Sequence, residues 1–209
     1  MNRFFILPAC LGVLTLLSVN LTTAQEIPED LVDDEHVREE FGINPITTPS
    51  IKKVFESLES LGTLPYERLK REIPDRPPRD RALVALSLGS LVADGFLIVQ
   101  SEQIEQIEPI GKSILSHAKI LGAGMKLSRH SKSIIESSGL GDFEKLKEEL
   151  AETQSDVEAE MVLLRDVDIV HLISLGGWLR ALEIVSKTAL TPYSPEKAKV
   201  VQRTDIIEY

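Results

Sequence analysis

The sequence predicts an all-α protein, a multi-helix bundle with two central apolar helices. The first observation is periodicity: apolar residues recur every three or four positions along most of the chain, as they do on one face of a helix. The second is that no segment alternates apolar and polar residues with the period of two that a half-buried strand shows. The third is a pair of apolar segments of helical length, 82–99 and 169–185.

The first 24 residues have the three parts of a secretory signal peptide. Arg3 precedes an apolar run over 4–19, and a polar stretch then ends in Thr22-Thr23-Ala24. The small residues at this point predict cleavage after Ala24 and export of the protein, to the periplasm or the medium. An uncleaved N-terminal anchor and a lipid attached at Cys10 are the two alternatives.

Composition and charge argue against several classes of function. The chain holds 33 acidic and 23 basic residues, a net charge of −10, and one cysteine, Cys10. Loss of residues 1–24 removes Cys10 and the cation Arg3, so the net charge becomes −11 and no thiol remains for a disulfide or a metal. Binding to phosphate backbones needs clustered cations, so this acidity argues against nucleic acid as a partner.

The rest of the chain divides where its composition changes. Residues 26–40 hold eight acids and one arginine, which predicts a flexible acidic arm over 25–48. We then expect a short helical hairpin over 49–73, a proline-rich linker over 74–80, a bundle core over 81–190 and a C-terminal helix over 191–209. Within the core we expect helices over 81–99, 102–122, 127–138, 142–165 and 167–189. Ile104 begins the inward apolar row of the second of these helices, and Leu164 ends that of the fourth.

Both long apolar segments carry a row of small residues at helical spacing. The rows are Ala85, Gly89 and Ala93 in one segment and Ser174, Gly177 and Ala181 in the other. Small side chains let helix axes approach closely, so we expect these helices to cross at the centre of the bundle. A transmembrane helix over 82–99 is the alternative, because small residues also pack helices in lipid. We expect no membrane association, since Asp94 would cost about 2.5–3.5 kcal/mol near a bilayer centre.

Polar residues interrupt the apolar rows at two places. Asp94 and Arg180 stand one in each central helix, and a charge in a core must be paired or hydrated. Our hypothesis is that the two form a buried polar pair or face a polar cavity; the alternative is that both reach water at the helix margins. In the predicted helix 142–165 the apolar row skips a turn at Thr153 or Gln154, where a polar layer fixes helix register or lines a pocket.

The charge distribution predicts a basic face over 112–132. No acid lies between Glu108 and Glu136, where the cations are Lys112, Lys119, Lys126, Arg129 and Lys132, together with His117 and His130. We predict that an anionic small molecule or an acidic protein partner binds there, through Lys119, Lys126, Arg129, His130 and Lys132. In the alternative interpretation, the following helix, with eight acids and two lysines over 142–160, folds back and neutralises this face within the molecule.

The sequence carries no recognisable catalytic motif. It has no nucleophile elbow, zinc-protease motif, phosphate-binding loop or dinucleotide-binding glycines. Nor does it have the paired Glu-x-x-His motifs of di-iron bundles, so we predict no catalytic residues, no metal site and no cofactor. We expect an exported, non-enzymatic binding protein, alone or as a homo-oligomer. The alternative is a bundle that carries a metal, a haem or a small organic ligand near Asp94, His171 and Arg180.

Overall fold

The computed structural model describes residues 35–40, 42–44, 47–48, 50–59, 62, 64–190 and 192–201. The predicted signal peptide over 1–24 and much of the predicted acidic arm lie outside these residues. The helices are α1 (Glu35–Glu40), α2 (Ile51–Glu59), α3 (Tyr66–Leu69), α4 (Arg81–Gln100), α5 (Ile104–Leu121), α6 (Gly124–Leu140), α7 (Phe143–Leu163), α8 (Val167–Ala189) and α9 (Pro195–Val201). Over the described part of the chain there is no β-strand, and the predicted all-α class is confirmed.

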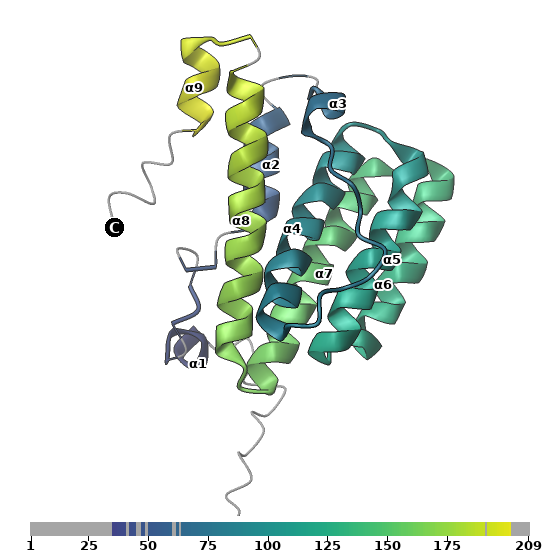
Figure 1. Ribbon diagram of the computed structural model, residues 1–209, viewed down its shortest axis with the longest axis vertical. Helices are drawn as coiled ribbons and strands as arrows, with labels where there is room; N and C mark the ends of the chain where they lie inside the picture. The colour runs from purple at the N-terminus through teal and green to yellow at the C-terminus, as the bar shows by residue number, and fades with distance from the viewer. Residues whose placement is uncertain are drawn as a thin grey trace, which may run out of the picture.

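Helix α4 lies at the centre of the bundle. It packs against α8, α5, α7 and α2, and Figure 1 shows it between α8 on one side and α5 and α6 on the other. Most residues from Val84 to Val99 are buried. This helix is apolar on all sides, and such a helix must be surrounded by other elements. Helices α5, α6 and α7 each pack on the helix before, and α7 also packs against α4 and α8.

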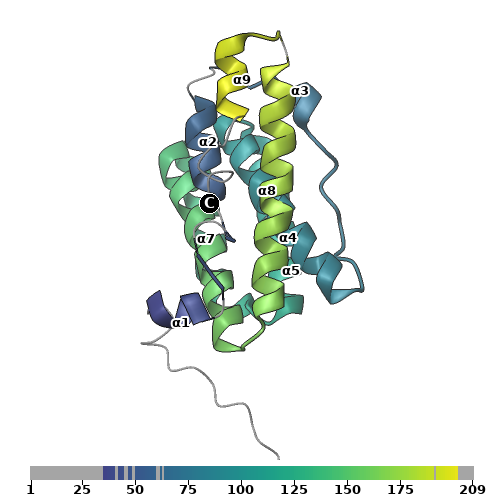
Figure 2. The same cartoon turned by 90° about the vertical axis from the view of Figure 1, so that its left-hand side faces the viewer.

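Helices α4 and α8 run in the same direction. The hydroxyl of Ser90 donates to the carbonyl oxygen of Gly176 at 3.1 Å, and Asp94 meets Arg180 four residues later on both helices. Both helices therefore ascend together from the lower end of the bundle in Figure 2. Two parallel helices need a long return connection, which α5, α6 and α7 provide.

Glycines allow the backbones of α4 and α8 to touch. A Cβ atom on Gly89 would lie 1.8 Å from the carbonyl oxygen of Ile173, and one on Gly176 would lie 2.1 Å from the carbonyl oxygen of Leu86. Backbone atoms cannot rotate out of the way as a side chain can. These two positions therefore require glycine for steric reasons rather than for their φ angles.

A glycine turn and a cap position α6 against α7. Gly141 ends α6 in the left-handed region at φ +68, which glycine adopts without strain. Asp142 then accepts a hydrogen bond from the backbone N–H of Lys145 at 3.1 Å and so caps α7. The helices form a hairpin in which one face of α6 lies along one face of α7.

Some predicted boundaries and core positions are wrong. Helix α6 begins at Gly124 instead of 127, because the turn after α5 needs only Gly122, at φ +106, and Ala123. Ile104 and Leu164 are 48% and 47% exposed. They stand at the first position of α5 and just beyond the end of α7, where the apolar rows leave the core.

Within the part of the chain that the structure describes, two helices, α4 and α8, are long and apolar enough to cross a membrane. In their most apolar windows, 72% of the residues of α4 and 56% of those of α8 are buried within the protein. Core helices of soluble proteins share this length and composition, so the observation is weak evidence for a membrane span.

The backbone contact at Gly89 predicts a strong effect of one methyl group. Gly89→Ala should lower the free energy of unfolding by about 1–3 kcal/mol or more, because overpacking against backbone forces the helices apart. Gly139→Ala is the matched control, since a Cβ atom there meets nothing within 4 Å. That variant should be neutral or more stable by up to about 1 kcal/mol, the helix-propensity difference. Urea unfolding measures both; equal effects would contradict the close packing.

Candidate functional site

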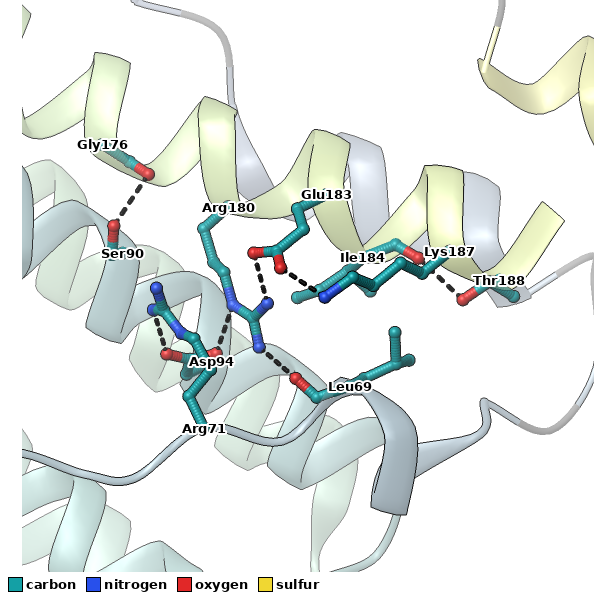
Figure 3. Close-up of polar contacts among 10 residues, drawn as sticks. All are labelled: Leu69, Arg71, Ser90, Asp94, Gly176, Arg180, Glu183, Ile184, Lys187 and Thr188. Atoms are coloured by element: carbon teal, nitrogen blue, oxygen red, sulfur yellow. Dashed lines mark hydrogen bonds and ion pairs between the residues drawn. The ribbon is translucent and has the colours of Figure 1, made fainter. Parts of the chain in front are cut away.

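The structure brings Asp94 and Arg180 together between α4 and α8. Nε of Arg180 donates to Oδ1 of Asp94 at 2.7 Å, and the side chain of Arg180 is 1% exposed. Figure 3 shows the other partners of the guanidinium, which are Oε2 of Glu183 at 2.6 Å and the carbonyl oxygen of Leu69. The second carboxylate oxygen of Asp94 accepts from Arg71 at 2.5 Å.

This charged cluster is internally satisfied. Each guanidinium nitrogen of Arg180 has an acceptor, and both oxygens of Asp94 have a donor. His171 is not part of the cluster, because nine residues, about 13 Å of helical rise, separate it from Arg180 on α8. The sequence suggested one ligand site near Asp94, His171 and Arg180. In the structure Asp94 and Arg180 belong to an ion-pair cluster, and His171 lies apart from it. The role that this geometry supports is structural, to fix α4, α8 and the chain near Leu69 relative to one another.

The residues of the predicted basic face are distributed over two helices. Lys119 is exposed on α5, whereas Arg129 and His130 stand on α6. Lys126 and Lys132 also lie in α6, but their side chains are outside the described part of the structure. Arg129 and His130 both face carboxylates of α7, Arg129 at 3.9 Å from Asp156.

A pocket of about 500 Å³ opens between α6 and α7 and contains His130. We call it the α6–α7 pocket; its lining residues are Arg129, His130, Ser133, Glu149, Glu152, Ser155 and Asp156. Each of them stands three or four residues from another lining residue of the same helix, a spacing that puts side chains on one helical face. The pocket is therefore a consequence of how the hairpin aligns its two polar faces.

His130 bridges two carboxylates at the floor of this pocket. Its Nδ1 lies 2.8 Å from Oε2 of Glu149 and its Nε2 lies 2.9 Å from Oδ2 of Asp156. Oε2 of Glu152 is 3.8 Å from the same Nδ1. The imidazole is 8% exposed, whereas the side chain of Glu152 is 64% exposed. The ring is thus buried between Glu149 and Asp156, whereas Glu152 is the most exposed of the three carboxylates.

The electrostatics of the cluster favour an imidazolium between two carboxylates. Burial opposes protonation of His130, but its hydrogen bonds with Glu149 and Asp156 outweigh burial and raise its pKa above the ordinary 6.5. Burial likewise opposes ionisation of Glu149, but hydrogen bonds from Ser133 and His130 lower its pKa below the ordinary 4.5. Both shifts favour the charged forms of these two groups.

The arrangement of Ser133, Glu149 and His130 differs from that of an activated nucleophile. The hydroxyl of Ser133 donates to Oε1 of Glu149 rather than to the imidazole. A serine nucleophile needs a base that removes its proton, and here both ring nitrogens of the histidine face carboxylates. The chemistry that these groups offer is the binding of a proton or of a cation.

His117, which the sequence placed within the basic face, is a core residue. It is fully buried, and its Nδ1 lies 2.7 Å from the carbonyl oxygen of Ser113. Burial lowers the pKa of His117, because the charged imidazolium loses its hydration. Its Nε2 is buried without a hydrogen-bond partner, so the neutral tautomer protonated on Nδ1 fits this environment.

The polar layer of α7 faces α8 rather than the pocket. Gln154 donates to Oε1 of Glu158 at 2.9 Å, and Ser174 of α8 donates to the same oxygen at 3.2 Å. Thr153 donates to the carbonyl oxygen of Glu149, on its own helix, at 2.6 Å. Burial raises the pKa of Glu158. Since these groups join α7 to α8, the geometry favours a role in helix register.

The carboxylates of the pocket were not among the predicted site residues. The spacing of these acids in the sequence is three and four residues, for Glu149, Glu152 and Asp156. In the predicted helix they therefore lie on one face. The sequence also indicated that this helix folds back on the basic segment. Those two signals together would have placed the three carboxylates beside His130.

The buried ion pair predicts unequal effects of two arginine substitutions. Arg180→Met should lower the free energy of unfolding by about 3–5 kcal/mol, because it leaves Asp94 without its buried partner. Arg71→Met removes the other guanidinium on Asp94, which is 44% exposed. Its loss should cost about 1 kcal/mol or less. Denaturant unfolding compares the two; equal costs would show that burial does not set the strength of this cluster.

The two buried histidines should titrate in opposite directions. In chelator-treated protein, ring resonances followed by NMR should give a pKa above 6.5 for His130 and below 6.5 for His117. A raised pKa in the folded state means that His130 stabilises the fold fully below pH 6.5, and that this contribution is lost as pH rises through its folded-state pKa. In His130→Gln, the free energy of unfolding measured against pH should no longer show this decrease. Similar pKa values for both histidines would contradict the bridge between carboxylates.

The pocket combines an imidazole and three carboxylates from the two helices of one hairpin. Comparison with protein-family models, with curated proteins and with solved structures gives no match. What the pocket can bind therefore follows from the chemistry of these side chains.

Proposed function

We propose that this chain is an exported, non-enzymatic binding protein whose α6–α7 pocket takes a positively charged ligand. The observation that carries the proposal is the convergence of Glu149, Glu152 and Asp156 on one pocket of about 500 Å³. Export is supported by the signal-like residues 1–24, and the small residues before Gln25 predict that the mature chain begins at that residue.

The charge of the pocket supports a cation. Three carboxylates face two cationic groups, Arg129 and His130, so the pocket carries a net negative charge even with the imidazole protonated. The side chain of Arg129 is 79% exposed and lies 3.9 Å from Asp156, so it can move toward solvent when a ligand enters. A cationic ligand would satisfy carboxylate oxygens that now face the pocket, whereas an anion would meet like charge.

Non-enzymatic binding is supported by the roles that the polar groups already have. The hydroxyl of Ser133 orients Glu149, and the ring nitrogens of His130 join Glu149 and Asp156. Such a network holds binding groups in place, and a rigid set of groups binds with a smaller entropic cost.

An anionic ligand on the basic face is the second candidate. The exposed side chains of Arg129 and Lys119 favour it, since both present cations to solvent. Binding that weakens steeply with salt and is lost in Arg129→Glu would assign the ligand to this face.

Native mass spectrometry and thermal unfolding test the proposal together. The exported protein, purified gently at low salt, should have the mass of residues 25–209 and carry an added cation or a small cationic molecule. A panel of divalent cations and polyamines should raise its melting temperature, and inorganic phosphate and citrate should not. Glu149→Gln should abolish the increase, whereas Glu148→Gln, an equal charge change at an exposed position outside the pocket, should retain it. Stabilisation by the anions alone would reject the cation site.

A further inference from the structure

We propose that the cation held in the α6–α7 pocket is a divalent transition metal, with Zn²⁺ as the probe ion. The ligands would be Nδ1 of His130 and one carboxylate oxygen each from Glu149 and Glu152. The inference rests on the proposed function, because it names the class of cation that the same pocket would bind.

The donor atoms are already close to the spacing that a metal requires. Those of His130, Glu149 and Glu152 all lie within 4.8 Å of one another. Nδ1 is 2.8 Å from the oxygen of Glu149 and 3.8 Å from that of Glu152. Ligands about 2.0–2.1 Å from a tetrahedral Zn²⁺ stand about 3.4 Å apart, which falls between these two distances. To admit the ion, the hydrogen-bonded atoms of His130 and Glu149 have to move apart by about 0.6 Å, and the exposed side chain of Glu152 has to turn inward.

The surrounding hydrogen bonds have the pattern of the outer shell of a metal site. When a histidine binds metal through one nitrogen, its other N–H is usually held by a carboxylate, which fixes the ring and its tautomer. Asp156 occupies that position, with Oδ2 at 2.9 Å from Nε2. Ser133 donates to Oε1 of Glu149 and leaves Oε2 directed at Nδ1. The ring and one ligating carboxylate are thus oriented before any ion enters.

The donor set selects the class of ion. One imidazole nitrogen with two carboxylate oxygens suits zinc and its neighbours in the transition series, whereas Ca²⁺ takes six to eight oxygen ligands. Three protein ligands leave at least one coordination position toward the pocket, where water or a small ligand can bind. The site would therefore hold an ion that remains accessible from solvent.

The first experiment measures Zn²⁺ binding to the purified, chelator-treated chain by competition with a chromophoric indicator. The wild type should bind one Zn²⁺ and should prefer it to Ca²⁺ and Mg²⁺. Asp156→Asn should lower the affinity about 10–100-fold, the usual effect of losing an outer-shell partner. Glu152→Gln should lower it at least as much, and Glu148→Gln should leave it unchanged. Circular dichroism and thermal unfolding establish that each variant is folded, which is expected for Glu152→Gln because the side chain of Glu152 is mostly exposed.

A second measurement identifies the ligating nitrogen. In ¹⁵N-labelled protein, Zn²⁺ should shift the Nδ1 resonance of His130, while Nε2 keeps the signature of a protonated nitrogen. No shift at His130, or equal loss of affinity in Glu148→Gln and Glu152→Gln, would overturn the inference. Stabilisation by a polyamine without Zn²⁺ binding would overturn it as well and leave the proposed function standing. Absence of binding by every cation would reject both.

Discussion

The contact between the backbones of α4 and α8 is the constraint on which the rest of the fold depends. With no Cβ at Gly89 and Gly176, the two helices lie too close for any other residue at these positions. That closeness fixes their relative register, so that Asp94 comes opposite Arg180 one turn beyond the bond from Ser90 to Gly176. The ion pair is thus placed by the glycines. Without this register Asp94 would lose its buried partner, which is strongly unfavourable.

The α6–α7 pocket depends indirectly on the same core, because one of its two helices, α7, packs against α4 and α8. Helix α7 packs against α4 and α8 with its apolar side, where Leu146, Leu150 and Val157 are buried. Its register on α8 is set in addition by Glu158 and Ser174. With its apolar side held there, α7 presents Glu149, Glu152 and Asp156 to α6. The packing of α7 on the central helices therefore also fixes the position of the carboxylates in the α6–α7 pocket.

The sequence predicts the interior of this protein better than its polar contacts. The helices 81–100 and 167–189 could be located almost to the residue, because an apolar segment of this length without proline is rarely anything but a buried helix. Asp94 and Arg180 could be singled out, since a charge inside an apolar helix requires a partner. Which further partners they have depends on register: Arg71 gave no signal of its own, and nothing in the pattern pointed to the carbonyl oxygen of Leu69. His130 looked like part of a cationic surface because charge was counted along the chain. In space, however, the charges nearest to its ring are the carboxylates Glu149 and Asp156 of α7. His130 therefore lies in negatively charged surroundings, whereas the count along the chain predicted positively charged ones.

The parallel arrangement of α4 and α8 has a consequence for the order of folding. The residues that join these helices are 86 positions apart in the chain, whereas α5, α6 and α7 can form hairpins from neighbouring segments. Contacts of such long range form late, because the entropy of closing a large loop must be overcome first. Until α8 has been synthesised, α4 is a 20-residue apolar helix without its main partner. The side of α4 that α8 covers therefore stays exposed in the nascent chain, and the core closes only when the last long helix is complete.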